Sequence, residues 1–350
     1  MNRVFILGAG ASHFAGYPLS PDLWAFIRDK VSAEVAAHRK AQEVIAAMDR
    51  ILHAIPPKEY DRPNLEELFT FLDLAELGTE PLVLSKIDWP MLRLYVMDMI
   101  SEAFLWHEYE FQKKIGARTT DTAVTVLEKW ADLLRNGDTI ITFNWDILHE
   151  AGLYRSGKWH YADGYGFACP EAGGHSHSPI QILKLHGSVN WAQRDEYDTK
   201  PAIEDTATFF GSAVEHNEVP RKSAGQANQG RNLIVPSYVK DITSNRLFLH
   251  LWNQASDALT NATEITVIGF QLHPADAPAR QLIGSALLRN SSIDHVTLVS
   301  PSGGDNWDEF CLKVGKTRKL IQKTFENWVL EYQSSGAITS KAIPESKPTH

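Results

Sequence analysis

The hydrophobic positions along the chain form two kinds of pattern, short continuous apolar runs and longer stretches with helical spacing. The short runs are rich in β-branched residues, which is typical of strands buried on both faces of a parallel sheet. The predicted strands are 4–7, 138–143, 180–185, 232–235, 264–268 and 295–299, with crossover helices near 245–259, 277–288 and 305–332. This alternation predicts a Rossmann-like α/β fold with an open, mostly parallel sheet and helices on both faces.

A long block of helical patterns interrupts the alternation after the first strand, at 21–55, 64–77, 91–115 and 122–134. We therefore expect an α/β domain made of residues 1–20 and 136–332, and an all-helical insertion at residues 21–135. Residues 193–231 are polar and rich in Gly, Asn and Thr, which predicts a surface loop. Residues 333–350 are predicted to be a disordered tail, because they lack apolar periodicity.

Composition and charge narrow the classes of function. The sequence has 34 Lys and Arg against 43 Asp and Glu, so no broad basic surface is expected for direct nucleic-acid binding. Its two cysteines, Cys169 and Cys311, lie far apart, which argues against a disulfide framework and a four-cysteine zinc site. Neither a signal-peptide pattern nor a run of about 18 apolar residues occurs. These features predict a cytoplasmic protein that does not contact a membrane.

The first strand runs directly into a glycine turn, Gly8-Ala9-Gly10-Ala11-Ser12. Glycines permit close backbone approach, and a helix after such a turn offers its N–H groups and positive dipole end to phosphates. A nucleotide is therefore a candidate ligand. An ordinary NAD dehydrogenase fits less well, because His13 replaces the third glycine of GxGxxG and the ribose-binding acid, about twenty residues further on, would fall near Asp29 in a helix.

Polar side chains follow two of the predicted strands. Asn144 and Asp146 come after strand 138–143, and His186 follows strand 180–185. Open α/β sheets bind ligands at the carboxyl ends of their strands. A histidine there can take a proton near neutral pH, and an asparagine amide can orient a water or a hydroxyl. The structural alternatives are that Asn144 and Asp146 cap the next helix and that His186 lies in a simple turn.

Three of these segments, in this order, resemble the motifs of the sirtuin family: the Gly8–Ser12 turn, Thr142-Phe143-Asn144-Trp145-Asp146, and His186-Gly187. The segment Ala15-Gly16-Tyr17-Pro18 is similar to the cofactor-binding loop of that family, and Gly269 to its late glycine. The resemblance implies NAD as the substrate and Asn144 and His186 as the catalytic residues. The residues that it implies for binding NAD are Gly8, Ala9, Gly10, Ser12, Pro18, Asp146 and Gly269.

The chain also departs from the sirtuin pattern. The deacylases of the family have an acidic residue, an aromatic residue and an arginine after the proline, whereas this sequence has Leu19, Ser20 and Pro21, and it lacks the four-cysteine zinc module. It looks more like the divergent bacterial sirtuin-like domains that hydrolyse NAD in defence against phage, often with a HerA-type DNA-translocating ATPase or an Argonaute-like partner. We therefore expect an NAD hydrolase that releases nicotinamide and ADP-ribose. A protein deacylase or ADP-ribosyltransferase, or a sensor that binds NAD or ADP-ribose without turnover, are the alternatives.

Two further patterns concern metals and assembly. A zinc cluster of His160, Cys169, His175 and His177 is conceivable, but the irregular spacing favours a turn region, so no metal is predicted. The helical insertion repeats more apolar residues than one α/β layer requires, so we expect a homo-oligomer whose assembly gates activity. These apolar residues are Leu65, Leu68, Phe69, Leu72, Leu94, Val96, Met97, Ile100 and Phe104. The alternative is that the insertion is a lid and core extension of a constitutively active monomer.

Overall fold

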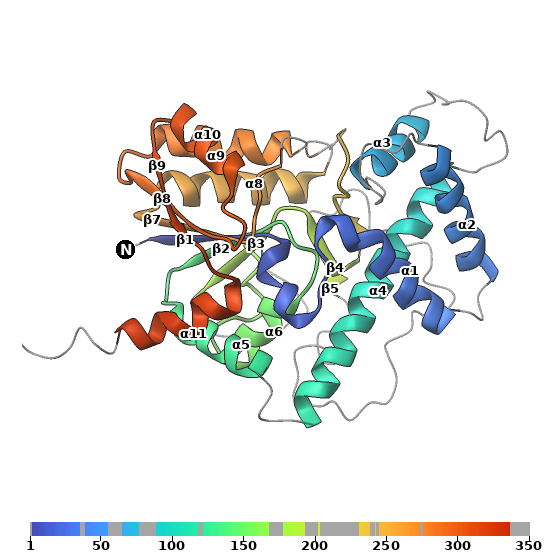
Figure 1. Ribbon diagram of the computed structural model, residues 1–350, viewed down its shortest axis with the longest axis horizontal. Coiled ribbons are helices and arrows are strands. Elements are labelled where there is room, and N and C mark those ends of the chain that lie inside the picture. The colour runs from blue at the N-terminus through green and yellow to red at the C-terminus, as the bar shows by residue number, and fades with distance from the viewer. Residues whose placement is uncertain are drawn as a thin grey trace, which may run out of the picture.

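The computed structural model has an α/β half and a helical half, which lie side by side (Figure 1). It describes residues 2–35, 39–54, 65–76, 89–117, 122–167, 178–192, 202–203, 231–238, 242, 245–273 and 276–336. The predicted surface loop at 193–231 therefore lies outside the described residues, apart from 202–203 and 231.

Six parallel strands form the main sheet, in the order β3-β2-β1-β7-β8-β9. Their bounds are β1 Arg3–Leu7, β2 Thr139–Thr142, β3 Gln181–Lys184, β7 Glu264–Ile268, β8 His295–Val299 and β9 Thr317–Ile321. The chain builds outward from β1 to β3 and then returns to build β7 to β9 on the other side, which is the strand order of a Rossmann-like sheet. The switch point lies between β1 and β7, and every residue of β1 is buried. The predicted fold class is confirmed.

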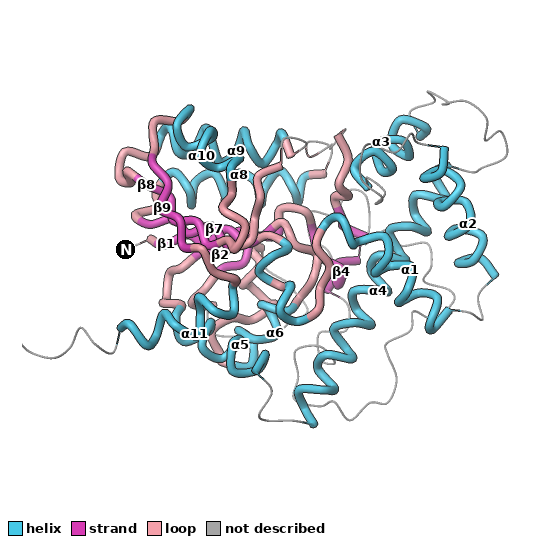
Figure 2. The backbone as a smooth tube through the Cα atoms, in the orientation of Figure 1, coloured by secondary structure: helices cyan, strands magenta, loops and turns pink. Residues whose placement is uncertain are grey.

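Helices cover both faces of this sheet, as the tube in Figure 2 also shows. One face carries α8 (Arg246–Thr260), α9 (Ala277–Arg289) and α10 (Asp305–Lys313), and the other carries α5 (Thr122–Leu133), α6 (Leu148–Arg155) and α11 (Phe325–Gly336). Helix α5 packs against α6 and α11, and its Trp130 ring meets Phe5 of β1 edge-on at 5.2 Å. This packing places α5 with the sheet, although the predicted insertion extends to residue 135.

The helical half is built around α4 (Trp89–Ala117). Each of α1 (Leu23–Val35), α2 (Arg39–Ala54) and α3 (Leu65–Glu76) contacts α4. Most of the apolar residues that predict an assembly surface are buried in this half, whereas Leu94 is 43% exposed. The insertion thus uses most of that apolar surface for its own core. Within the part of the chain that the structure describes, no helix is both long and apolar enough to span a bilayer.

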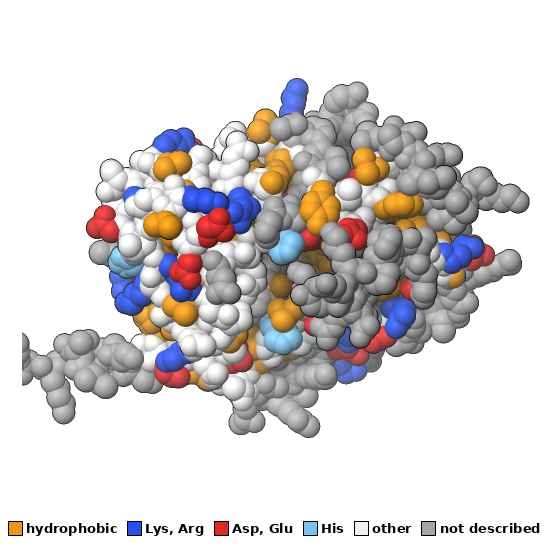
Figure 3. Space-filling model, turned by 45° about the horizontal axis from the view of Figure 1, so that its top comes forward, with side chains coloured by type: hydrophobic (Ala, Val, Ile, Leu, Met, Phe, Trp, Pro, Cys, Tyr) orange, Lys and Arg blue, Asp and Glu red, His pale blue; other side chains and the backbone are white. Residues whose placement is uncertain are grey.

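A small antiparallel sheet lies at the junction between the halves. Its central strand, β4 (Gly187–Ala192), pairs with β5 (Ala202–Ile203) and β6 (Arg231–Leu233), and α4 contacts β4 and β6. The apolar run at 232–235 predicts a strand of the parallel sheet, and this is wrong, because β6 pairs with β4 here. Figure 3 looks onto the junction, where hydrophobic and histidine side chains gather between the two halves.

The end of the chain also differs from its prediction. The helical spacing at 305–332 predicts one helix, but the structure has α10, β9 and α11 there. Gly315, with φ +67°, forms the turn after α10, and β9 is a half-exposed edge strand in which charged and apolar residues mix. Helix α11 continues to Gly336, so residues 333–336 are helical rather than part of a disordered tail. Residues 337–350 lie outside the described residues.

Candidate active site

The glycine turn lies at the switch point, against the turn that follows β7. The amides of Gly8 and Gly10 donate to the carbonyl oxygens of Ile268 and Gly269, at 3.0 and 3.1 Å. A Cβ on Gly8 would lie 2.6 Å from the Gly269 oxygen, and one on Gly10 would lie 2.8 Å from the Gly269 Cα. Gly269 itself has φ +61°, a left-handed conformation that favours glycine. The three glycines therefore let two backbone turns touch where the sheet changes direction.

The turn differs in two respects from the phosphate cradle that the sequence predicts. A side chain at Gly10 would strike the turn after β7, rather than stand between the glycine turn and a pyrophosphate. No long helix follows directly, because short 3₁₀-helices come first, η1 (Ala9–Ala11), η2 (His13–Ala15) and η3 (Ser20–Asp22), and α1 begins at Leu23. Such short helices provide little macrodipole for an anion. NAD binding by this turn stays a prediction that depends on close backbone approach.

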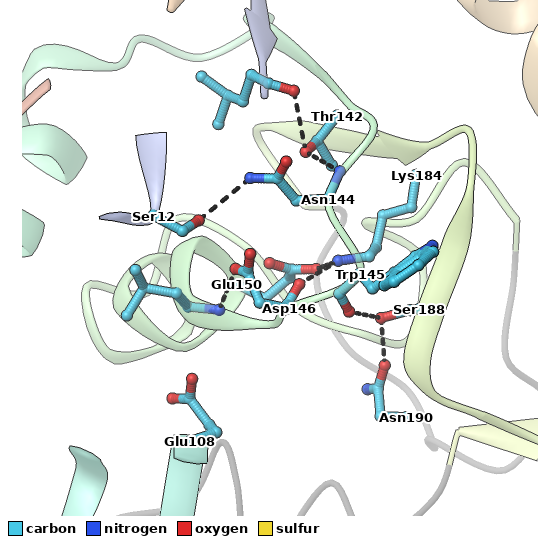
Figure 4. Close-up of polar contacts among 12 residues, drawn as sticks. Ser12, Glu108, Thr142, Asn144, Trp145, Asp146, Glu150, Lys184, Ser188 and Asn190 are labelled. Carbon is cyan, nitrogen blue, oxygen red and sulfur yellow. Dashed lines mark hydrogen bonds and ion pairs between the residues drawn. The ribbon is translucent and has the colours of Figure 1, made fainter. Parts of the chain in front are cut away.

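Asn144 connects the end of β2 to the glycine turn (Figure 4). Its Nδ2 donates to the Gly8 carbonyl oxygen at 2.9 Å and to Ser12 Oγ at 3.2 Å. Its backbone N–H donates to Thr142 Oγ1 at 3.1 Å. These bonds hold the amide so that its oxygen keeps one direction, and Asn144 is only half-buried. Asn144 is thus a pre-oriented acceptor at the edge of the sheet rather than a cap of α6.

His186 occupies the equivalent place on the neighbouring strand. Thr142 pairs in register with Lys184, and the Leu185 N–H donates to the Thr142 carbonyl oxygen at 2.9 Å. Asn144 and His186 each follow their paired strand residue by two positions. The structure therefore brings the two predicted catalytic residues to the same carboxyl edge of the sheet, next to the glycine turn.

The imidazole of His186 lies between an aromatic ring and a carboxylate. It packs edge-on against Phe143, with centroids 5.0 Å apart, and Phe143 stacks on Phe270 at 4.4 Å. Its Nε2 is 3.8 Å from Asp276 Oδ1, at the start of α9, and both side chains are largely buried. A carboxylate at this distance stabilises the imidazolium that forms when a histidine accepts a proton. His186 therefore has the surroundings of a general base.

Asp146 contacts its own loop. Its Oδ1 accepts a hydrogen bond from the Leu148 N–H at 3.2 Å, at the beginning of α6, and the residue is 4% exposed. The bond satisfies the first N–H of α6 from the residue before its N-cap, Ile147, so Asp146 has the local role that the capping alternative expects. Its carbonyl oxygen accepts a hydrogen bond from Lys184 Nζ, and Lys184 also pairs with Glu150 Oε1 at 2.6 Å. Ribose binding by Asp146 stays a prediction.

Three buried ionisable side chains, Glu108, His149 and Glu150, lie near Asp146 and have shifted pKa values. Burial raises the pKa of Glu108, on α4, to about 7, and it raises the pKa of Glu150. Burial lowers the pKa of His149 to about 4, so this second histidine is neutral among the rings of Trp130 and Phe325. The sequence did not single out Glu108 or Glu150, although an acidic residue inside an apolar helical pattern was the available signal.

Pro18, another predicted NAD-binding residue, lies in the loop after the glycine turn. Pro18 is half-buried and follows Tyr17, whose hydroxyl donates to Glu108.

The described residues hold no group of three or more His, Cys, Asp or Glu side chains that could bind a metal. Of the cluster considered for zinc, Cys169, His175 and His177 lie outside the described residues, so the structure does not test it.

Structural comparison finds Sir2 proteins similar to this chain. A structure of Sir2Tm bound to a propionylated peptide is 15% identical, with a TM-score of 0.40, over 96% of this chain and 94% of that chain. A mutant Sir2 homologue in complex with ADP-ribose is 12% identical, with a TM-score of 0.43, over 98% and 95%. No protein-family model and no curated protein matches the chain. The fold class itself follows from the strand order, and the site is a polar centre at the switch point of a Rossmann-like sheet.

Proposed function

We propose that this protein is an NAD glycohydrolase, which converts NAD and water to nicotinamide and ADP-ribose. The observation that carries the proposal is the matched placement of Asn144 and His186 after two paired strands, with Asn144 bonded to the glycine turn. Ligands of open α/β sheets bind at this edge, next to the switch point. Three motifs that resemble those of the sirtuin family therefore converge on one centre.

The chemistry requires few protein groups. The bond between the nicotinamide nitrogen and ribose C1′ breaks, and a bond between C1′ and the water oxygen forms. Nicotinamide leaves as a neutral molecule because its ring is cationic in NAD, so no acid is needed for its departure. His186 takes the proton of the water and later releases it to solvent, and Asp276 stabilises the intervening imidazolium. Asn144 orients the water or a ribose hydroxyl through its side-chain oxygen.

The residues after Pro18 support water, rather than an acyl-lysine substrate, as the acceptor of the ADP-ribosyl group. In this chain Leu19, Ser20 and Pro21 replace the acidic, aromatic and arginine residues of the deacylase pattern. Ser20 begins η3, which leads directly into α1 of the helical half. The segment is therefore part of the connection to the insertion.

We further propose that the enzyme is an effector of antiphage defence that depletes cellular NAD. Such a hydrolase must be silent until a signal arrives, so a partner or self-assembly is proposed to release its activity. The partner classes implied by the resemblance are a HerA-type ATPase and an Argonaute-like protein. Leu94, which is 43% exposed on α4, is an apolar side chain that can contact another chain.

The test is product analysis by chromatography after incubation of the full chain with NAD, alone and with each class of partner. We expect equal amounts of nicotinamide and ADP-ribose. Modified acyl-peptide or ADP-ribosylated protein in place of free ADP-ribose would favour the transferase alternatives. Binding of NAD without any release of nicotinamide, under all these conditions, would favour a sensor and refute the hydrolase.

A further inference from the structure

The insertion helix α4 holds the loop after the glycine turn through two consecutive residues. His107 Nε2 lies 2.9 Å from the carbonyl oxygen of Ala15, and Glu108 accepts a hydrogen bond from the Tyr17 hydroxyl. The Tyr17 ring also packs edge-on against His107, with centroids 4.6 Å apart, and it is 2% exposed. Helix α4 therefore fixes both the backbone and a side chain of the loop Ala15–Pro18.

The loop is connected directly to the candidate site. The Ala15 N–H donates to the Ser12 carbonyl oxygen at 3.1 Å, and Ser12 Oγ accepts a hydrogen bond from Asn144 Nδ2 at 3.2 Å. A displacement of Tyr17 would therefore be passed through Ala15 and Ser12 to the amide that orients the reacting water. These contacts run without interruption from the helical half to the end of β2.

Glu108 is an unusual residue for a purely structural contact. It is fully buried, and its second oxygen accepts a hydrogen bond from Gln112 Nε2. Burying a carboxyl group costs more free energy than burying a neutral acceptor would. In Figure 4 its carboxyl group points from α4 towards the side of Asp146, the residue two positions after Asn144.

We propose that Glu108 is a positioning residue that, through Tyr17, holds the loop Ala15–Pro18 and Asn144 in the arrangement that receives NAD. Helix α4 of the insertion thereby sets the affinity of the site for its substrate. The statement about NAD rests on the proposed function, whereas the statement that α4 fixes the loop through His107 and Glu108 does not.

The arrangement predicts a pH dependence of binding. Burial raises the pKa of Glu108 to about 7, the hydrogen bonds from Tyr17 and Gln112 act to lower it, and of the nearby charges Asp146 raises it and Arg155 lowers it. The ionised carboxylate accepts the bonds of Tyr17 and Gln112, and hydrogen bonds to charged groups are the stronger ones. Affinity for NAD should therefore rise as the pH increases through 7, and Glu108→Gln should show a flatter profile.

The experiment combines hydrogen exchange with calorimetry. Amide exchange of residues 12–18 is measured without ligand in the wild type, Tyr17→Phe, Glu108→Ala and Glu108→Gln, and the NAD dissociation constant is measured for each in a His186→Ala background. We expect exchange and dissociation constant to rise roughly tenfold in Tyr17→Phe and Glu108→Ala, and less in Glu108→Gln. Glu110→Ala is the matched control, because Glu110 lies on the same helix, is 38% exposed and pairs with Lys30.

The outcomes separate this proposal from the proposed function. Unchanged exchange in Tyr17→Phe and Glu108→Ala overturns the hold of α4 on the loop. Faster exchange with an unchanged dissociation constant shows a merely structural contact and overturns the positioning role. Faster exchange in Tyr17→Phe and Glu108→Ala, combined with no NAD binding by either the wild type or His186→Ala, refutes the proposed function and leaves the contact between α4 and the loop supported. Should Glu108→Ala not fold, Tyr17→Phe decides by the same two measurements.

Discussion

A single added methyl group at Gly8 tests the contact between the two backbone turns. Gly8 has φ -118° and ψ -173°, an extended conformation that alanine adopts without strain. The effect of Gly8→Ala is therefore steric alone. The new Cβ would lie 2.6 Å from both the Gly269 oxygen and the Phe270 Cα, and these are backbone atoms that cannot rotate away.

The size of the effect follows from this geometry. Ordinary contact begins at 3.4 Å, so the turns must separate by about 0.8 Å. Overpacking of this kind typically costs about 1–3 kcal/mol of stability. The Gly8 carbonyl oxygen also accepts the hydrogen bond from Asn144 Nδ2, so the Asn144 amide moves with the turn. Misplacement by about 1 Å can lower a rate roughly 100-fold, so we expect turnover to fall by up to about that factor.

Urea unfolding and nicotinamide release measure the two quantities. The matched control is Gly284→Ala in α9, where the nearest atom would lie 3.4 Å away and alanine favours the helix. The control should be as active as the wild type and no less stable. If Gly8→Ala unfolds at the wild-type urea concentration and releases nicotinamide at the wild-type rate, the contact between the turns does not organise the site.

Three further predictions concern the buried charges. Asp276→Asn should keep NAD affinity and lower turnover roughly tenfold or more, because the imidazolium of His186 loses its counter-charge; equal steady-state rates would contradict this role. Lys184→Met should destabilise the fold by about 3–5 kcal/mol in urea unfolding, because Glu150 stays buried without a cation, and adding Glu150→Gln should recover part of the loss. Because the folded-state pKa of Glu108 lies near 7 instead of 4.5, ionisation of this residue lowers the stability of the wild type as the pH rises between these values. Glu108→Gln should lose up to about 3 kcal/mol less between pH 5 and pH 8, and parallel stability curves would show that Glu108 is not the group responsible.

Short-range patterns predict the buried strands well. The mainly β-branched and apolar runs at 264–268 and 295–299 coincide with β7 and β8, because strands covered on both faces bury most of their side chains. The prediction missed β9, since a half-exposed edge strand carries charges among its apolar residues and its spacing resembles that of a helix. It misplaced β6 because a run of apolar residues does not specify which strand it pairs with.

Local sequence patterns also fail to specify the partners of the site residues. The rule that ligands bind at strand ends predicted where Asn144 and His186 lie, because strand register brings them together. Their supporting groups come from distant parts of the chain. Tyr17 and Glu108 are separated by 91 positions, and Lys184 and Glu150 by 34, so no local spacing indicates these pairs. The spacing of the apolar residues in the insertion likewise does not indicate how many of them its own core buries, since their packing around α4 is a long-range property.

Nicotinamide release by the wild type and His186→Ala, measured together with calorimetric binding of NAD, tests the hydrolase directly. The wild type, with its activating partner where one is required, should release nicotinamide and ADP-ribose in equal amounts. His186→Ala should bind NAD with similar affinity and release nicotinamide about 10²–10⁴-fold more slowly, which is the usual loss when a general base is removed. Equal rates in the two proteins, or NAD binding by a wild type that never releases nicotinamide, would contradict the assignment of His186 as the base of an NAD glycohydrolase.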